Sequence, residues 1–443
     1  RMPPRTEPAR GMRDFLPEDV RRREFAIGVI TRVYERYGFE PLETPAAENL
    51  ETLMGKYGEE GNQLIFKILK RGEHAASGEA DLALRYDLTV PLARVIAHHQ
   101  AKLPRLFKRY QIQPVWRADR PARGRFREFF QCDVDSLGST SPVVEAELCA
   151  AVSEALSELG FSDFVIRLNH RQLLTSILNT SGVPEPLHGT ALVAVDKLDK
   201  IGRDGVHAEM VERGINADAA GRLLSAFELL RDDMKGSRSV LTDEIGLASF
   251  ENLATIMTLT EGTSAGSRMR FDPSLARGLS YYTGAIMEIN VPDLAGSLGG
   301  GGRYDNLVGM FLGQGVPACG FSLGLERILV VMGERGMFPS SLRNTPADVM
   351  TAVFDPKDAP HALRVAALLR ASGLRVMTYP DGDKIGKQIK YADSRGIPFV
   401  AILGGDEISN GTVTVKDLAN QTQTTYDQAA AGAAILEGLK HRG

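Results

Sequence analysis

The sequence has 443 residues, of which 43% are hydrophobic, enough to bury a large core in two or three domains. Its formal net charge of −4 excludes a chain that is basic overall, so any surface for nucleic acid must be a local patch. Three scattered cysteines are too few for a disulfide framework or a structural zinc site, which favours a reducing, cytoplasmic location. No run of about 18 apolar residues occurs, so we expect no membrane span.

The first third of the chain predicts a mixture of helices and strands. Apolar residues recur every fourth position over 17–37, which predicts an amphipathic helix that ends at Gly38. The proline-flanked piece after it, 39–45, suits a sheet edge or an interface. A helix is expected over 141–160, with Pro142 in its first turn. Strands are predicted at 82–86, 114–116 and 128–135.

The remainder divides into three parts. From about residue 171 to 262 the pattern is mostly helical, which indicates an inserted helical module. Strand-like, glycine-punctuated sequence returns over 269–323, and a helix follows Gly324. After the linker 339–346, strands alternate with helices. This alternation predicts a small separate α/β domain with a mostly parallel sheet.

The densest chemical signal is the basic segment 102–127. It contains nine basic residues and one acidic residue, Asp119, and predicts two extended arms around a loop with Pro121 and Gly124. Arginine suits phosphate oxygens because its planar fork gives bidentate, charge-assisted hydrogen bonds. A solvated basic hairpin is the alternative, because charged runs are usually surface. The basic residues are Lys102, Arg105, Lys108, Arg109, Arg117, Arg120, Arg123, Arg125 and Arg127.

Two later motifs combine aromatic residues with glycine. The first, 277–284, reads Arg-Gly-Leu-Ser-Tyr-Tyr-Thr-Gly; on a strand, Tyr281 and Tyr282 would point to opposite faces, one into a pocket and one into the core. The second, 299–305, reads Gly-Gly-Gly-Gly-Arg-Tyr-Asp, and its glycines let the backbone approach a flat or charged ligand. It fits neither the dinucleotide fingerprint nor the P-loop. A bulged core strand and a flexible turn are the structural alternatives.

Two shorter signals accompany these motifs. The segment 320–329 predicts a strand, a glycine turn and a helix, whose early Arg327 could reach over a nucleotide. In 84–91, Asp87 and Thr89 share one face if a strand continues through them, and an acid beside a hydroxyl could hold an ammonium group. The alternatives are an ordinary surface Glu-Arg pair and helix capping by Asp or Thr.

In this order, the segments resemble a class II aminoacyl-tRNA synthetase, and more narrowly the histidyl-tRNA synthetase family. The resemblance runs from the Arg-Gly-Met-Arg-Asp-Phe-Leu-Pro segment at 10–17 nearly to the C-terminus. The helix before Gly38 and the strand after it resemble motif 1, the Arg117 hairpin resembles motif 2, and the Arg327 segment resembles motif 3. Segments 277–284 and 301–305 resemble signatures of the histidine enzyme, and 384–393 resembles its anticodon-binding domain.

The resemblance implies a fold and a reaction. The fold is an α+β catalytic domain over 1–338 with an antiparallel sheet and the helical insertion at about 171–262, followed by the α/β anticodon-binding domain over 347–443. The reaction is the ligation of histidine to its tRNA through histidyl-adenylate, with ATP and Mg²⁺ but no metal held by the protein alone. The implied protein is a cytoplasmic homodimer that does not enter membranes.

The resemblance also implies residue roles. Arg117 and Arg277 would be catalytic, both at the ATP α-phosphate, with Arg117 also holding the histidine carboxylate, and Arg327 would clamp the γ-phosphate. An acid and a phenol, Asp135 and Tyr282, would bind the two imidazole nitrogens, because an amino acid lacking these would leave buried polar groups unpaired. The other histidine-binding residues implied are Asp87, Thr89 and Gln131, at the ammonium group, and Tyr281.

Ser280 stands where an aspartate is common in the family. If that acid orients Arg277, activity is reduced here; if it only supports the backbone, serine serves as well. One rival is a non-catalytic paralogue, the regulatory subunit of ATP phosphoribosyltransferase in histidine biosynthesis. That relative typically lacks the C-terminal domain and loses motif arginines, which this chain retains. A class II synthetase for another amino acid and a plain RNA-binding protein are further rivals, and the Tyr-Tyr signature with Asp135 argues against both.

Overall fold

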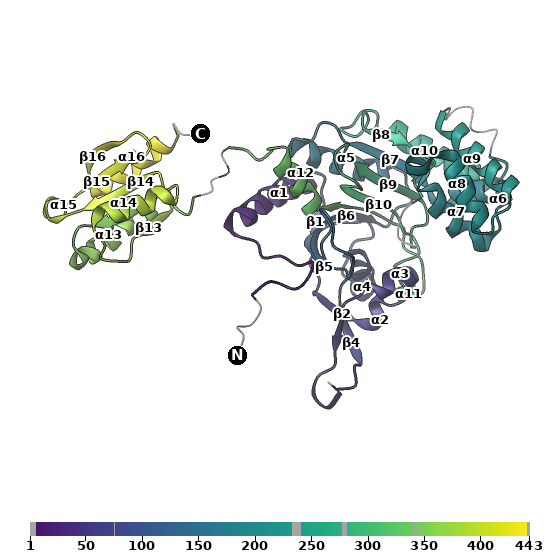
Figure 1. The fold of residues 1–443 in the computed structure, drawn as a ribbon, viewed down its shortest axis with the longest axis horizontal. Helices are drawn as coiled ribbons and strands as arrows, with labels where there is room; N and C mark the ends of the chain where they lie inside the picture. The colour runs from purple at the N-terminus through teal and green to yellow at the C-terminus, as the bar shows by residue number, and fades with distance from the viewer. Residues whose placement is uncertain are drawn as a thin grey trace. The chain divides into compact units, whose positions relative to one another are not determined.

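The computed structural model describes residues 6–74, 76–232, 241–276, 281–340, 342 and 345–440. The chain divides into two compact units, one formed by Arg1–Phe15 with Arg22–Met337 and the other by Leu16–Arg21 with Phe338–Gly443 (Figure 1). In the described part of the chain, no helix combines the length and the apolar character that crossing a membrane requires.

An eight-stranded sheet forms the centre of the first unit. Its strand order is β1-β5-β6-β11-β10-β9-β7-β8. Neighbours run antiparallel except at the two edges, where β1 pairs parallel with β5 and β8 pairs parallel with β7. The expected antiparallel sheet is therefore confirmed. Its strands are β1 (Glu40–Pro41), β5 (Phe107–Trp116), β6 (Glu128–Leu137), β7 (Val165–His170), β8 (Met269–Phe271), β9 (Ala285–Asn290), β10 (Gly299–Arg303) and β11 (Ala318–Gly324).

Helices cover one face of this sheet. The predicted amphipathic helix is α1 (Pro17–Arg36), and its buried Tyr34 donates a hydrogen bond to the Cys132 carbonyl of β6 at 3.2 Å. α5 (Val143–Glu158) packs against β11, and α12 (Leu325–Glu334) packs against β6. Because side chains alternate along a strand, Cys132 and Val134 face this helical layer. The residues between and beside them on β6 therefore face the other side of the sheet.

The predicted helical insertion is confirmed. Figure 1 shows α6 to α9 gathered beside the β7 end of the sheet. Two of the helices begin at side-chain caps: the His170 ring nitrogen accepts a hydrogen bond from the Gln172 N–H at 3.2 Å, and the Asp243 carboxylate accepts one from the Gly246 N–H at 2.6 Å. The helices are α6 (Arg171–Thr180), α7 (His188–Val195), α8 (Leu198–Glu212), α9 (Ala217–Asp232) and α10 (Glu244–Thr260).

A small antiparallel sheet and short helices lie beside the uncovered face of the large sheet. The small sheet has the order β2-β4-β3, and β4 leads through a short turn into α4. Tyr57, Tyr86 and Leu92 from this region pack with Tyr281 and Tyr304 in one hydrophobic core. The elements are β2 (Ala47–Asn49), α2 (Leu50–Leu53), α3 (Gly58–Gln63), β3 (Lys67–Leu69), β4 (Ala80–Leu84), α4 (Thr89–His99) and α11 (Gly309–Leu312).

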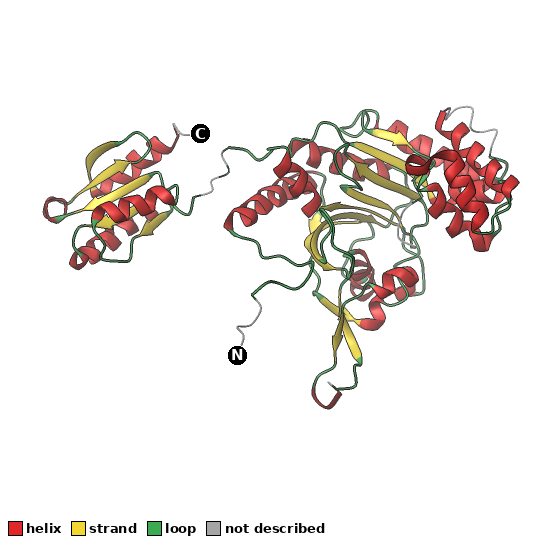
Figure 2. Cartoon of the chain, viewed as in Figure 1, coloured by secondary structure: helices red, strands yellow, loops and turns green. Residues whose placement is uncertain are grey.

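The second unit is a five-stranded sheet with helices on both faces (Figure 2). In the order β13-β12-β14-β15-β16, the first three strands are parallel, as predicted, and the last two are antiparallel additions. The addition follows from short connections, because a parallel crossover needs a dozen or more residues. The elements are β12 (Val349–Val353), α13 (Ala359–Ala371), β13 (Val376–Thr378), α14 (Ile385–Ser394), β14 (Phe399–Leu403), α15 (Gly405–Asn410), β15 (Thr412–Asp417), β16 (Thr422–Asp427) and α16 (Gln428–Lys440).

Candidate active site

The uncovered face of the large sheet forms the floor of a cavity of about 700 Å³. On β6, Gln131, Asp133 and Asp135 all point to this face, because they are two residues apart. The register places Ser322 of β11 beside Asp133 and Gly320 beside Asp135. The cavity therefore has a polar floor made by neighbouring strands rather than by one contiguous motif.

The four-glycine run is a strand and not a flexible turn. Residues 299–302 form most of β10 and pair on both sides, with β9 and with β11. A Cβ atom on Gly301 would lie 2.2 Å from the Gly320 carbonyl oxygen, and one on Gly302 would lie 2.7 Å from the Ala285 carbonyl oxygen. Gly299, Gly300 and Gly301 line the cavity. Glycine is thus needed both for close strand packing and for an open cavity floor.

Gly320 makes the room that the Asp135 carboxylate occupies. A Cβ atom at this position would lie 1.8 Å from Asp135 Oδ1. That oxygen accepts a hydrogen bond from the Tyr304 hydroxyl, and Oδ2 lies 2.8 Å from Arg109 Nη2. Burial raises the pKa of Asp135, and the Arg109 guanidinium opposes this shift. Asp135 is therefore a buried carboxylate whose Oδ1 accepts a hydrogen bond, whereas its Oδ2 is paired with Arg109 by charge and receives no hydrogen bond from the described residues.

The strand does not continue through Asp87, so the alternative given for this segment, an acid that binds the start of a helix, applies. β4 ends at Leu84, and Thr89 is already the first residue of α4. The Asp87 Oδ1 atom accepts hydrogen bonds from the Val90 N–H at 3.1 Å and from the Tyr57 hydroxyl at 2.9 Å. The capping role does not remove Asp87 from the cavity, because both Asp87 and Thr89 line it.

Tyr281 and Tyr282 do not lie on a strand, so the predicted division between pocket and core is wrong. They precede β9, and both line the cavity. Their ring centroids are 5.2 Å apart with a 74° angle between the ring planes. The Tyr281 hydroxyl donates to Asp87 Oδ2 at 3.0 Å, and burial raises the pKa of both phenols. Both tyrosines thus present side chains to the same space.

The opposite end of the cavity is rich in arginine. The basic segment folds as predicted, with β5 and β6 as the arms of a hairpin and Gly124 in its turn at φ +67°. Arg117 donates to the Tyr86 carbonyl at 3.0 Å and lies over the Tyr86 and Phe129 rings, at 4.3 and 5.2 Å. These contacts hold a half-buried guanidinium at the cavity wall.

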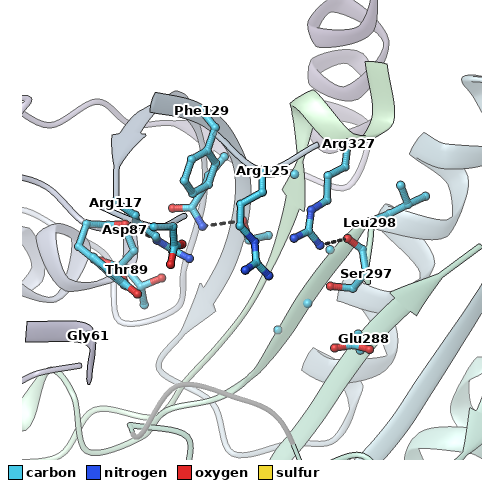
Figure 3. Close-up of a pocket in the computed structure, with 18 of the residues that line it drawn as sticks. Gly61, Asp87, Thr89, Arg117, Arg125, Phe129, Glu288, Ser297, Leu298 and Arg327 are labelled. Atoms are coloured by element: carbon cyan, nitrogen blue, oxygen red, sulfur yellow. Dashed lines mark hydrogen bonds between the residues drawn. The ribbon is translucent and has the colours of Figure 1, made fainter. Parts of the chain in front are cut away.

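Arg327 enters the cavity from the start of α12. Its Nη1 donates to the Ser297 carbonyl at 2.5 Å, and a Cβ atom on Gly124 would lie 3.1 Å from its Cγ. Figure 3 shows Arg125 and Arg327 extending side by side into the cavity, with Arg117, Asp87 and Thr89 grouped farther along it. The hairpin turn and the helix start therefore bring Arg125 and Arg327 to one end, whereas Arg117 lies beside Asp87 and Thr89.

The cavity and the small recess beside it together contain eight of the nine predicted site residues. Arg277 and Ser280 lie outside the described residues. Asp135 lines a small recess of about 20 Å³ that shares Thr89, Tyr282, Gly300 and Ser322 with the main cavity. The remaining predicted residues line the main cavity itself: Asp87, Thr89, Arg117, Gln131, Tyr281, Tyr282 and Arg327.

Sequence reasoning missed several residues that line the cavity. Tyr57 comes from the turn before α3 and donates to Asp87 across 30 positions of sequence. Glu288 of β9 is buried, and its Oε1 lies 3.3 Å from Arg167 Nη1. Arg125 was visible as one of nine basic residues but nothing singled it out. Asp133 could have been predicted from the sequence, because it alternates with Gln131 and Asp135 and therefore lies on the same face of the strand.

The histidyl-tRNA synthetase family model matches residues 11–328, and an anticodon-binding domain model matches residues 348–437. A histidine–tRNA ligase of Christiangramia forsetii is 41% identical over 96% of this chain and 98% of that protein. One from Gloeobacter violaceus is 40% identical over 97% of this chain and 98% of that protein. These similarities extend over nearly the whole chain, including both structural units.

Solved structures give the same relationship. The crystal structure of histidyl-tRNA synthetase from Nostoc sp. PCC 7120 has a TM-score of 0.81 and 32% identity, covering 98% of this chain and 100% of that chain. A structure from Bacillus halodurans C, described as an ATP phosphoribosyltransferase regulatory subunit/histidyl-tRNA synthetase, has a TM-score of 0.73 at 21% identity, covering 91% of this chain and 99% of that chain. At that identity the second likeness concerns the fold alone.

Proposed function

This chain belongs to the histidyl-tRNA synthetase family, whose activity is the ATP-dependent ligation of histidine to tRNA, and we propose that the cavity is its adenylation site. The observation that carries the proposal is the cavity's division into an arginine end and a carboxylate end. ATP needs the first, because its phosphates are anionic, and the ammonium and imidazole groups of histidine suit the second.

At the arginine end, the chemistry is attack of the histidine carboxylate on the α-phosphorus of ATP. Arg117 would hold the two anionic groups together, which a guanidinium can do by donating from different N–H groups. Arg277 would act at the same phosphate, and Arg327 at the γ-phosphate. Their common role is to align the reactants and to neutralise charge that develops during displacement of pyrophosphate.

Mg²⁺ bound together with ATP would neutralise phosphate charge during the reaction. Among the described residues, no group of three or more His, Cys, Asp or Glu side chains is arranged to hold a metal ion. Magnesium sites of this kind usually add only one or two carboxylates, and Glu288, which lines the cavity, fits that need.

At the carboxylate end, Asp87, Thr89 and Gln131 would bind the ammonium group. Gln131 Oε1 is buried and, within the described part of the chain, has no hydrogen-bond donor, so it offers an acceptor to a substrate N–H. Tyr281 would hold Asp87 in place through its hydrogen bond. Asp135 and Tyr282 would bind the imidazole, since both face the small recess.

The transfer step would follow in the same cavity. The 3′-terminal hydroxyl of tRNA attacks the carbonyl of histidyl-adenylate and releases AMP. The domain over 347–443 would bind the anticodon, which its match to an anticodon-binding domain supports. We further propose a homodimer formed through the motif 1 segment, and action in the cytoplasm, where charged tRNA is used.

The regulatory-subunit alternative has weaker support. Arg117 and Arg327 both line the cavity, and the C-terminal unit is present. The similar proteins at 40–41% identity are ligases. No observation favours a purely regulatory protein over a ligase.

Histidine-dependent exchange of pyrophosphate into ATP tests the proposal. We expect exchange with histidine and with no other standard amino acid, because only histidine satisfies both ends of the carboxylate pocket. A folded protein that exchanges with no amino acid contradicts the adenylation site. Exchange with another amino acid would retain the class and overturn the roles of Asp135 and Tyr282. Charging of tRNA with labelled histidine then tests the transfer step.

A further inference from the structure

Asp133 is a buried carboxylate for which the proposed adenylation chemistry has no role. It lies on β6 between Gln131 and Asp135, on the face that forms the cavity floor, and it is 2% exposed. It also lines the small recess that shares residues with the main cavity. Its position therefore lies between the proposed ammonium end and the proposed imidazole end of the substrate.

The two neighbouring aspartates differ in how their oxygens are used. Asp135 has one oxygen engaged by the Tyr304 hydroxyl and the other 2.8 Å from Arg109 Nη2. Asp133 Oδ2 lies 3.9 Å from the same Arg109 nitrogen, and Oδ1 has no hydrogen-bond donor among the described residues. Asp135 Oδ2 also receives no hydrogen bond from the described residues, but the Arg109 guanidinium lies close enough to compensate its charge. Arg109 lies farther from Asp133, so Asp133 Oδ1 is the less compensated of the two open acceptors.

An unused acceptor in a buried site is uncommon, because such an atom has lost its water without gaining a partner. The recess has room for about one water molecule, since a water needs roughly 10–15 Å³ of this volume and the recess provides about 20 Å³. A water can therefore serve Asp133 when the site is empty. The edge of a planar ring that enters from the main cavity would displace it.

We propose that Asp133 is a further specificity-determining residue, whose carboxylate accepts a hydrogen bond from an imidazole N–H of bound histidine. The proposal rests on the adenylation site proposed above and adds one residue that recognises the imidazole ring. Asp135, held by Arg109 and Tyr304, keeps its proposed contact with the ring, and Asp133 supplies a second acceptor for the same ring N–H. Gly300 lines both the recess and the main cavity and has no side chain that would fill the space for the ring.

Charge supports the same assignment. Three carboxylates, those of Asp87, Asp133 and Asp135, are at most 2% exposed at this end of the cavity, whereas Arg109 is the buried cation that contacts two of them. The end is therefore short of positive charge and of N–H donors. Histidine supplies both, through its ammonium group and its ring N–H. A neutral or acidic side chain of similar size would leave the Asp133 oxygen unpaired.

The test is the nearly isosteric variant Asp133→Asn, studied in the full chain by pyrophosphate exchange. We expect the KM for histidine to rise about 10- to 100-fold, because a hydrogen bond to a charged acceptor is lost. The kcat and the KM for ATP should stay within about twofold, since Arg117 and Arg327 are untouched. The matched control is Asp348→Asn, which changes a buried aspartate with an arginine partner outside the cavity and should leave all three constants unchanged.

A second measurement separates ring recognition from a structural role. Histidine and its two N-methyl derivatives are compared as ligands of the wild-type protein and of Asp133→Asn. We expect wild type to reject the derivative that lacks the N–H facing Asp133, and the variant to lose about tenfold of that preference. Asp133→Ala provides a second variant if the amide itself makes a new hydrogen bond.

Several outcomes overturn the proposal. An unchanged KM for histidine in a folded Asp133→Asn protein shows that Asp133 makes no hydrogen bond that contributes to histidine binding. A parallel loss of ATP affinity and thermal stability shows a purely structural role. Wild-type protein that fails to exchange with histidine refutes the adenylation site itself, and this failure is distinguishable because it precedes any variant.

Discussion

The two ends of the cavity are built from the same hairpin but follow opposite physical rules. At the arginine end, which is proposed to bind ATP and is called the nucleotide end below, Arg117 and Arg327 are half-buried and Arg125 is exposed. At the carboxylate end, which is proposed to bind histidine and is called the histidine end below, Asp87, Asp133 and Asp135 are almost fully buried and lie near tyrosine hydroxyls and Arg109. A polyphosphate is strongly anionic, so it can be bound by flexible arginine side chains at the solvent-exposed opening of the cavity. A neutral ring is distinguished only where water is excluded and each polar atom has one partner.

We therefore expect substitutions at the two ends of the cavity to change different kinetic constants. Loss of a cation at the nucleotide end should slow the chemistry, because charge develops there during the reaction. A substitution that displaces the buried carboxylates of the histidine end should weaken the binding of histidine, because these groups are held in position before the substrate binds. The following substitutions test this difference, from the largest expected effect to the smallest.

Arg117→Ala should produce the largest loss. Removal of the guanidinium takes away the group that aligns the histidine carboxylate with the α-phosphate, so kcat in pyrophosphate exchange should fall about 100- to 1,000-fold. Arg120→Ala is the matched control, because Arg120 is an exposed arginine of the same hairpin loop and does not line the cavity. Equal losses in both variants would show that the loop provides only general positive charge.

Gly320→Ala should damage the histidine end alone. The new Cβ atom would lie 1.8 Å from Asp135 Oδ1, so the carboxylate must move and the KM for histidine should rise about 100-fold. Overpacking should also cost about 1–3 kcal/mol of unfolding free energy in a urea titration. Gly333→Ala is the control, since nothing lies within 4 Å of its added Cβ. A normal histidine KM in Gly320→Ala would refute the tight fit around Asp135.

Glu326→Gln tests a buried carboxylate at the nucleotide end. Burial raises the pKa of Glu326 from 4.5 to about 7, although its carboxylate accepts the Phe130 N–H at 2.9 Å and faces Arg13 and Arg23. The folded protein therefore retains a proton that the unfolded chain releases between these values, and stability is lost as pH rises through that range.

The amide variant does not titrate, so the wild type should lose stability relative to it as pH rises from about 4.5 to about 7. The relative loss should be on the order of 2–3 kcal/mol in urea unfolding at the two pH values. Glu212→Gln, at an exposed position, should follow the wild-type curve. Parallel curves for wild type and Glu326→Gln would show that Glu326 is already ionised throughout.

Arg125→Ala should have the smallest effect. The side chain lines the cavity but is exposed, so solvent weakens its interaction with a phosphate. We expect the KM for ATP to rise about two- to fivefold at low salt and the difference to shrink at 0.5 M salt, as screening predicts. The KM for histidine should not change. A larger effect on histidine than on ATP would contradict the assignment of the two ends.

Local pattern was enough to predict the elements that carry the nucleotide end. The helix α1 followed from apolar spacing, and the hairpin followed from a basic run interrupted by Pro121 and Gly124. The start of α12 followed from a glycine before a helical pattern. These features are local because hydrophobic periodicity and turn residues act over a few positions.

The histidine end required the tertiary structure. The sequence favoured a strand for Tyr281 and Tyr282 and left Asp87 open between a strand and a helix start. All three lie outside the strands and meet in space. The four-glycine run, 299–302, was compatible with a flexible turn. Its pairing with both β9 and β11 shows that it is a strand and forms part of the cavity floor. Tyr57 and Tyr281 reach Asp87 from 30 and 194 positions away.

By itself, the sequence determined most of the helical and extended segments, the position of the arginines proposed to bind phosphate, and the separate α/β unit after residue 346. The tertiary structure decided which carboxylates share one face and which of their oxygens are left without a hydrogen-bond donor among the described residues. The physical reason is that burial and hydrogen-bond partners at this end depend on strand register. A shift of one residue would move Gln131, Asp133 and Asp135 to the helical side of the sheet and empty the site.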